Sequence, residues 1–477
     1  MKRLFYIVFL LLSVLHHGCI QPAVNLTAKS DPWLTADSIL KQIQPPVFPG
    51  RTFNILSYGA KNDGKTNCSK AFQKAITACH QAGGGKVLVP PGKYYSGPIY
   101  LKSNVNLHLE KGAVILFSVK PEDYLPLVYT RWEGVELMNY SPLIYAFEEE
   151  NIALTGEGIL DGQAGPGNWW TWKGKAEYGW KEGMPNQTDP GKRDLLFKMG
   201  ENGTPVKDRI FGQGAQLRPQ FVQPYRCSNV LIEGITIINS PMWVLNPVLC
   251  TNVTISKVTI NSEGPNSDGC DPESCKNVII KDCYFNTGDD CIAIKSGRNA
   301  DGRRINIASE NIIIQNCTMA NGHGGIVLGS EISGGVHHVF AENCTMSSPE
   351  LDRALRIKTS SMRGGITEHI YLRNIEVGQV KEQALIATML YEDSGSFLPV
   401  IRNIEVRNMT VKQAGKTGIL LEAYNESPIE NFRLVDCKID GAETPYLFSN
   451  VRNISLENVT INGIVITDSQ IGKETKD

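Results

Sequence analysis

The sequence lacks three features that would assign it to large classes of protein. Its 47 Lys and Arg residues are balanced by 49 Asp and Glu residues, so no basic surface for nucleic acid or for an anionic membrane is indicated. Beyond the N-terminus, no apolar run approaches the roughly 18 residues of a membrane-spanning helix. The 12 cysteines form no CxxC pair, which disfavours structural zinc. We therefore expect no nucleic-acid partner, no membrane span, no metal and no cofactor.

The first residues have the composition of an export signal. A basic start precedes an apolar run over residues 4–15, which is too short to span a bilayer. Cys19 follows a glycine, as in a bacterial lipoprotein signal, but His16 and His17 stand where such signals carry small or apolar residues. Two outcomes stay open: a lipid anchor on Cys19, or simple cleavage nearby. Both predict a signal peptide over residues 1–19 and an exported protein, periplasmic or at the cell surface.

The cysteines favour buried thiols over a disulfide framework. An oxidising compartment would permit disulfides. However, several cysteines lie in or beside short apolar strand patterns, where a thiol behaves as a small hydrophobic group. These are Cys275, Cys283, Cys317, Cys344 and Cys437. If Cys19 is acylated or removed, the number left is odd, so at least one thiol stays unpaired within the chain.

A short sequence pattern recurs along the chain from about residue 104. It consists of a polar Asn or His, a run of alternating apolar residues, a polar pair, and a second run of alternating apolar residues. Copies begin at Asn229, Asn252, Asn277, Asn311, His338, His369, Asn403, Asn431 and Asn453, at intervals of 22 to 34 residues. Stacked β-coils with variable loops would give such a period, whereas an α/β repeat would need a helix in each unit. The sequence therefore predicts an all-β fold, a single-stranded right-handed parallel β-helix over residues 51–470. We expect two or three short strands per coil and an internal ladder of the recurrent Asn side chains.

Three further segments flank or interrupt the repeats. A solenoid end needs a cap, and residues 69–82 predict a capping helix whose apolar face carries Phe72, Ala75, Ile76 and Cys79. Residues 20–50, which include Gln44-Pro45-Pro46, are interpreted as an N-terminal linker. Residues 162–213, rich in Trp and Gly, predict an elaborated loop over a binding face rather than a second domain. Its aromatic side chains suit either packing or stacking on a sugar.

The densest polar motifs follow one another at intervals of about one coil. They are Asn266-Ser267-Asp268, Gly288-Asp289-Asp290, Gly322-His323-Gly324 and Arg356-Ile357-Lys358. In a β-helix this spacing stacks all four on one face of neighbouring coils, a few ångströms apart.

Asp268, Asp289 and Asp290 would then form a cluster in which neighbouring negative charges raise the pKa of one member. A glycosidase needs a protonated carboxyl group for the leaving oxygen and an ionised one for water or the sugar. Arg356 and Lys358 are two residues apart on a strand pattern and point to the same side, where they could hold a substrate carboxylate. The motifs therefore indicate cleavage of an acidic sugar.

In this order the motifs resemble the signature of the polygalacturonases, family 28 of the glycoside hydrolases, and the resemblance extends from residue 55 to the final coils. It implies hydrolysis of α-1,4-linked galacturonic acid in pectin with inversion at the anomeric carbon. The roles it implies are general acid for Asp289, positioning and deprotonation of water for Asp268 and Asp290, support of the acid for His323, and substrate binding for Arg356, Lys358, Asn266 and Tyr391.

Two positions depart from the family pattern. Ser267 replaces a threonine and keeps its hydroxyl group. Many fungal and plant relatives carry a cysteine just before the histidine motif, where this chain has Met319-Ala320-Asn321. A disulfide from Cys291 to that loop would therefore need another partner, for which Cys317 is the candidate.

The mode of action and the substrate leave alternatives open. The insertions at 162–213 and 298–304 could close one end of a cleft. The sequence Cys291-Ile-Ala-Ile-Lys-Ser-Gly also resembles that of bacterial exo-acting members of the family. We therefore expect release of galacturonate from chain ends. The alternatives are a rhamnogalacturonan or xylogalacturonan hydrolase, a pectate lyase whose aspartates ligate Ca²⁺, and a non-catalytic carbohydrate-binding β-helix. We expect a monomer whose partners are pectic polysaccharide or oligogalacturonides. Asp271 and Glu331 lie near the motifs but outside them and are interpreted as structural or peripheral.

Overall fold

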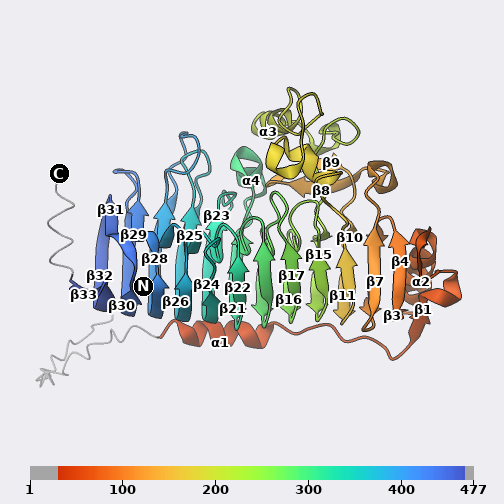
Figure 1. The fold of residues 1–477 in the computed structure, drawn as a ribbon, viewed down its shortest axis with the longest axis horizontal. Coiled ribbons are helices and arrows are strands. Elements are labelled where there is room, and N and C mark those ends of the chain that lie inside the picture. Colours follow the sequence, from red (N-terminus) through yellow and green to blue (C-terminus); the bar gives the residue numbers. More distant parts are fainter. Residues whose placement is uncertain (1–30, 468–477) are drawn as a thin grey trace, which may run out of the picture.

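The computed structural model describes residues 31–467, which form an elongated stack of β-coils (Figure 1). Parallel strands of successive coils pair in three rows that run along the long axis. Because parallel crossover connections are right-handed, the chain winds into a right-handed parallel β-helix, as predicted. The predicted signal peptide and Cys19 lie outside the described residues.

The first row comprises β1 (Thr52–Asn54), β3 (Gly85–Val89), β6 (Val105–Leu109), β11 (Glu150–Gly156), β14 (Ser228–Glu233), β16 (Thr251–Ser256), β18 (Lys276–Lys281), β21 (Ser309–Gln315), β24 (Val336–Met346), β26 (Ile366–Gln379), β28 (Val400–Gln413), β30 (Ile429–Ile439) and β32 (Val451–Ile461). The second row comprises β2 (Asp63–Asn67), β4 (Gly92–Ser96), β7 (Ala113–Phe117), β12 (Ile159–Asp161), β15 (Thr236–Ile238), β17 (Thr259–Ser262), β19 (Tyr284–Thr287) and β22 (Thr318–Asn321), and it merges into β24.

The third row comprises β5 (Ile99–Tyr100), β10 (Ile144–Phe147), β13 (Val222–Tyr225), β20 (Ile292–Ile294), β23 (Ile326–Gly329), β25 (Arg353–Lys358), β27 (Gln383–Thr388), β29 (Gly415–Glu422) and β31 (Ala442–Ser449). Single bridges from Val222 through Leu245 and Cys270 to Ile292 make this row continuous between β13 and β20. The functional motifs lie along this third row.

Alternation within each strand builds the core. In β6 and β7 every second side chain is buried, which is the period-2 pattern of a strand with one face inward. Register then stacks like on like: Ile280 of β18 lies between Ile255 of β16 and Ile314 of β21. One coil cannot bury its apolar face alone, so the core is continuous through the stack.

The recurrent asparagines stack as predicted, but they are half-buried to exposed rather than internal. The Asn252 amide donates to Asn229 at 3.2 Å, and the Asn311 amide donates to Asn277 at 2.9 Å. His338 and His369 continue the ladder as rings stacked at 4.9 Å. These residues have φ between 55° and 60°, a left-handed conformation that Asn tolerates better than most residues. The recurrent Asn therefore marks a bend near the start of each first-row strand, and the prediction of an internal ladder was wrong.

The N-terminal end of the stack is capped by a helix, and the C-terminal end is covered in part. Helix α2 (Ser69–Gln81) forms where the capping helix was predicted, and its apolar face, including Phe72 and Ile76, is buried against the first coils. At the other end, β33 (Ile464–Ile466) folds back antiparallel on β32. Both devices protect strand edges from pairing with another chain.

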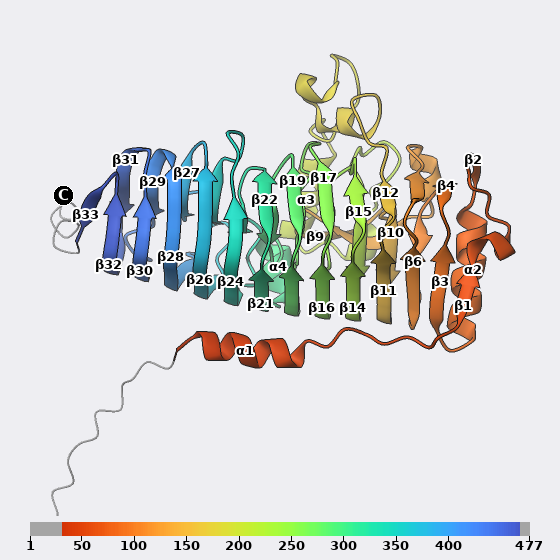
Figure 2. The ribbon, with the colours of Figure 1, turned by 60° about the horizontal axis from the view of Figure 1, so that its bottom comes forward.

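The segment that we interpreted as a linker contains helix α1 (Trp33–Gln42), so that interpretation needs correction. Trp33, Ala36 and Ile39 are buried against the outward side chains Ile313 of β21 and Phe340 of β24. Their spacing of three residues places them on one helical face. The rest of the segment runs beneath the sheet toward β1 (Figure 2). Among residues 31–467, no helix is long and apolar enough to cross a membrane.

A group of loops projects over one side of the stack, most of them from the chain between β7 and β13 (Figure 1). We call this group the wall: the antiparallel hairpin β8 (Val128–Trp132) and β9 (Val135–Asn139), helix α3 (Arg193–Glu201) in the predicted 162–213 loop, and helix α4 (Asn299–Ile305). Ion pairs join its parts, at 2.9 Å between Arg209 and Asp301, which are both buried, and at 2.8 Å between Arg193 and Glu133. The wall is therefore a fixed part of the fold.

Candidate active site

The four motifs come together at one edge of the third row, as the coil spacing predicted. Asp268 lies just before the bridge at Cys270, Asp289 and Asp290 just before β20, and His323 just before β23. Arg356 and Lys358 belong to β25, whose residues pair with β23. Stacking of adjacent coils thus brings residues that are far apart in the sequence onto one surface.

Asp268, Asp289 and Asp290 form a tight group. Each offers a carboxylate oxygen within 4.8 Å of the others. Asp268 and Asp290 are buried, whereas Asp289 is partly exposed. Oxygens at this spacing can share one bound water, because two hydrogen bonds of about 2.7 Å span the gap.

Asp290 is held by the cationic pair on β25. Lys358 Nζ lies 2.7 Å from Asp290 Oδ2, and Arg356 Nη1 lies 3.4 Å from Asp290 Oδ1. The ring of Tyr391 lies 5.5 Å from the Arg356 guanidinium and 5.4 Å from the Lys358 ammonium, measured to its centre. The structure therefore places Tyr391 beside the Arg356–Lys358 pair.

His323 contacts the middle acid. Its Nδ1 lies 3.1 Å from Asp289 Oδ1, and its ring is half-exposed. The flanking glycines permit this approach: Gly322 has φ +152°, and a Cβ atom there would lie 2.4 Å from the Asp289 carbonyl oxygen. At Gly324, a Cβ atom would lie 2.5 Å from a methyl group of Val327. The glycines are therefore needed to seat the histidine next to the acids.

Asn266 serves this region indirectly. Its side-chain oxygen accepts hydrogen bonds from Lys173 Nζ at 2.7 Å and from Arg218 Nη2 at 2.8 Å. The structure records no hydrogen bond between Asn266 and the three aspartates. Lys173 comes from the 162–213 loop, so Asn266 ties that loop to the catalytic coil.

The surroundings of the three acids shift their pKa values in different directions. Burial, reinforced by the charge of Asp289, raises the pKa of Asp268 to about 8. Burial alone would raise the pKa of Asp289, but the hydrogen bond and charge of His323 outweigh it and lower that pKa. The same contact raises the pKa of His323 to about 9. Burial would also raise the pKa of Asp290, but Lys358 and Arg356 keep it lowered.

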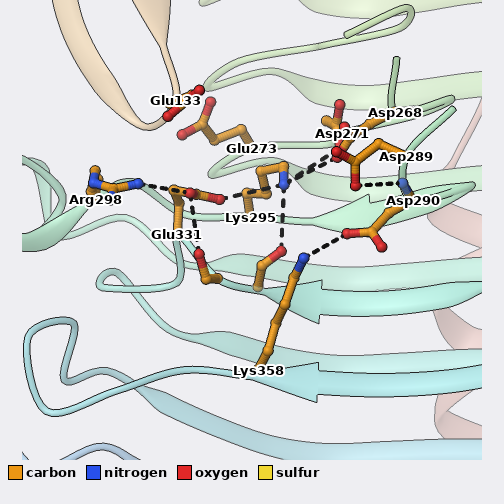
Figure 3. A network of polar contacts seen from close by, with 12 residues as sticks. Glu133, Asp268, Asp271, Glu273, Asp289, Asp290, Lys295, Arg298, Glu331 and Lys358 are labelled. Atoms are coloured by element: carbon orange, nitrogen blue, oxygen red, sulfur yellow. Dashed lines mark hydrogen bonds and ion pairs between the residues drawn. The ribbon is translucent and has the colours of Figure 1, made fainter. Parts of the chain in front are cut away.

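A second set of charged residues lies directly behind these acids, and the motifs did not reveal it (Figure 3). Lys295 is buried 3.4 Å from Asp268 and 3.8 Å from Asp271, and it also lies 3.4 Å from Glu331. Glu331 in turn accepts from Arg298 at 3.0 Å. The signal in the sequence was a lone lysine ending the apolar run Cys291-Ile-Ala-Ile.

Three clustered carboxylates are also a possible set of metal ligands. Here protein cations already match their charge, since Lys358 contacts Asp290 and His323 contacts Asp289. Ca²⁺ takes about 6–8 oxygen ligands, and this group offers carboxylates that are already paired. The arrangement fits acid–base chemistry better than metal binding.

Cysteines and tryptophans near the site have structural roles. Every cysteine among residues 31–467 is free and buried. Cys291 does not pair with Cys317, and its thiol donates to the Asn321 carbonyl at 3.1 Å. Trp169 is buried with its ring 4.8 Å from that of Trp172, so this part of the 162–213 loop packs rather than offering a face to a sugar.

A parallel β-helix that stacks three aspartates with a histidine and an Arg-x-Lys pair is the scaffold and site of a glycoside hydrolase. The chain belongs to glycoside hydrolase family 28: the family described as Glycosyl hydrolases family 28 matches residues 206–460, more than half of the sequence. A second match, Rhamnogalacturonase A/epimerase, pectate lyase-like, covers residues 52–109.

Several named proteins are similar over most of their length. A "Probable polygalacturonase" of Vitis vinifera is 29% identical over 430 residues, which cover 84% of this chain and 78% of the relative. The "Exo-poly-alpha-D-galacturonosidase" of Dickeya chrysanthemi is 27% identical over 467 residues, 87% of this chain and 75% of the relative. The structure of a hyperthermoactive exopolygalacturonase from Thermotoga maritima superposes with a TM-score of 0.88 at 45% identity, covering 91% of this chain and 96% of that one.

Proposed function

We propose that this chain hydrolyses α-1,4-linked galacturonan and releases galacturonate from chain ends. The observation that carries the proposal is the cationic pair Arg356 and Lys358 beside a buried carboxylate cluster that holds a proton near neutral pH. His323, Arg356 and Lys358 are three cations against the two ionised acids Asp289 and Asp290. The surplus positive charge suits a substrate that carries a carboxylate on each sugar.

The geometry supports a mechanism in which Asp268 and Asp289 share one proton. Before substrate binds, the raised pKa of Asp268 places this proton on Asp268. Its transfer to Asp289 runs against the order of the two pKa values in the free enzyme, and it creates both catalytic groups at once, an acid at Asp289 and a base at Asp268. Asp289 then protonates the glycosidic oxygen as the C–O bond breaks, and Asp268, with Asp290, takes a proton from the water that attacks the anomeric carbon. Attack from the opposite face inverts that carbon, as the family resemblance implies.

The wall supports the exo assignment. It rises on one side of the acids, and Glu133 and Arg298 at its foot lie next to the charged residues behind Asp268 (Figure 3). The Arg298 amide donates to the Gly134 carbonyl at 3.0 Å, which fastens α4 to the β8–β9 hairpin. A fixed barrier beside the acids would favour binding of a polymer end over binding of its middle.

The products from galacturonan oligomers of defined length test this proposal. We expect galacturonate alone from the first time points, appearing first as the inverted anomer in ¹H NMR, and no effect of a calcium chelator. An early ladder of intermediate sizes would reject exo action. An unsaturated, ultraviolet-absorbing product would instead identify a lyase, and binding without new reducing ends would identify a carbohydrate-binding protein. Parallel assays on rhamnogalacturonan and xylogalacturonan test the neighbouring specificities.

The shared proton sets an expected alkaline limit of activity. Asp268 has a pKa of about 8, so the pair keeps its proton below that pH and loses it above. Activity on galacturonan should therefore be retained near neutrality and fall as pH rises through about 8. The measurement is kcat/KM against pH, which reports the titrating groups of the free enzyme, with circular dichroism to show that the fold persists. Undiminished kcat/KM two pH units above the expected limit would contradict the shared-proton mechanism.

The predicted export signal lies outside the described residues. We propose that the protein is exported and monomeric, with either a lipid anchor on Cys19 or cleavage nearby. Export agrees with a polymeric substrate, which is met outside the cell.

A further inference from the structure

Lys295 occupies a position that the family motifs do not account for. It follows β20 directly, is 3% exposed, and places its ammonium group 3.4 Å from Asp268 Oδ2 and 3.4 Å from Glu331 Oε2. The ring centre of Trp243 lies 4.5 Å from the same nitrogen. A buried ammonium group between two carboxylates interacts strongly with both, because little water screens it.

We propose that Lys295 is a positioning residue for the hydrolysis proposed above: its charge holds Asp268 in place and favours movement of the shared proton from Asp268 to Asp289, while Glu331 opposes this effect by competing for the same ammonium group. The inference rests on the proposed function for its kinetic consequences. The electrostatic relation between Lys295 and Asp268 can be measured without any substrate.

Glu331 connects Lys295 to the wall. Its Oε1 accepts from Arg298 Nη1 at 3.0 Å and from the Ser330 hydroxyl at 3.2 Å, and Arg298 Nη2 reaches Glu392 at 3.3 Å. Glu331 is therefore held by Arg298 and Ser330 through one carboxylate oxygen, while its other oxygen faces Lys295. The ammonium group of Lys295 lies between Asp268 and this anchored Glu331 (Figure 3).

The direction of the effect follows from the charges around each group. The largest charge effects on Asp268 come from Asp289, Asp290, Lys295 and Lys358, and Asp268 also interacts with Asp271. Those that act on Lys295 include Glu331, Asp268, Asp271 and Asp290, and Lys295 also acts on Glu273. Removing the positive charge of Lys295 makes ionised Asp268 less favourable, whereas removing the negative charge of Glu331 makes it more favourable. The two changes must therefore shift the titration of Asp268 in opposite directions.

The test compares Lys295→Met and Glu331→Gln in full-length protein. For Lys295→Met we expect kcat on galacturonan to fall about 10- to 100-fold near neutral pH, with KM within about threefold, and the alkaline limit to move up by about one pH unit or more. For Glu331→Gln we expect the alkaline limit to move down. Lys257→Met removes an exposed lysine paired with Glu233 on another surface, and should change neither value.

A substrate-free measurement separates this inference from the proposed function. The side-chain ¹³C carboxyl signal of Asp268, identified by its loss in Asp268→Asn, is titrated in each protein. Opposite shifts in Lys295→Met and Glu331→Gln support the inference even if galacturonan proves not to be the substrate. Shifts in the same direction, or no shift, would overturn it. If Lys295→Met does not fold, Glu331→Gln alone decides, because an unchanged or raised Asp268 pKa in that variant contradicts the competition.

Discussion

Asp289→Asn is expected to lower kcat on galacturonan by about 10²- to 10⁴-fold, the usual contribution of general acid–base catalysis, with little change in KM. The amide keeps the shape of the carboxyl group but cannot donate a proton to the leaving oxygen. The measurement is release of reducing ends under steady-state conditions. Wild-type turnover in this variant would exclude Asp289 as the acid.

A substrate with a leaving group that needs no protonation distinguishes the acid from the base. On an aryl α-galacturonide with a strongly acidic phenol, Asp289→Asn should recover much of its lost kcat. Asp268→Asn serves as the matched control, because loss of the base affects water attack on either substrate. Equal defects of both variants on both substrates would show that the roles of Asp268 and Asp289 are not separated as we propose.

Lys358→Met is expected to destabilise the fold by about 3 kcal/mol. The substitution leaves the buried Asp290 carboxylate with Arg356 as its remaining cation, at a longer distance than Lys358. Lys358 Nζ lies 2.7 Å from Asp290, whose side chain is 1% exposed, while Arg356 remains at 3.4 Å. Activity should fall as well, because the cationic pair that is proposed to bind the substrate carboxylate loses one member. The measurement is the free energy of unfolding from reversible guanidinium titration.

Two further variants show whether burial causes this loss. The double variant Lys358→Met/Asp290→Asn removes the uncompensated charge and should be more stable than Lys358→Met alone. Lys276 and Glu310 form an ion pair of the same 2.7 Å length at the surface, and Lys276→Met should change stability by no more than about 1 kcal/mol. Similar losses in Lys358→Met and Lys276→Met would contradict the electrostatic explanation.

The sequence was sufficient to predict the fold and the meeting of the motifs, because both follow from the repeat. A coil of 22 to 34 residues fixes which side chains stack, so Asp268, Asp290 and Arg356 could be placed together before any coordinates. The partners of Lys295 could not be predicted in the same way. Glu331 lies in a loop, and the path of a loop is not determined by strand periodicity.

Two other predictions, for the N-terminal segment and for the recurrent asparagines, differ from the structure for local reasons. The apolar spacing of Trp33, Ala36 and Ile39 was visible in the sequence, but whether a short helix forms depends on a surface to receive it. The recurrent asparagines were interpreted by their side chains, whereas their left-handed backbone conformation determines where they stand. In both cases the sequence contained the pattern, but it did not show which surface or backbone conformation the pattern would meet in the fold.

Helix α1 imposes an order on assembly. It is synthesised before any coil of the solenoid, yet the surface that receives it is built from Ile279, Ile313 and Phe340, with Tyr371 packed beside them, on four successive coils from the middle of the chain. That surface is not complete until β26 has joined the stack, so α1 must wait undocked while several coils form. Its docking joins four neighbouring coils from outside, and a chain halted before Phe340 would lack this contact.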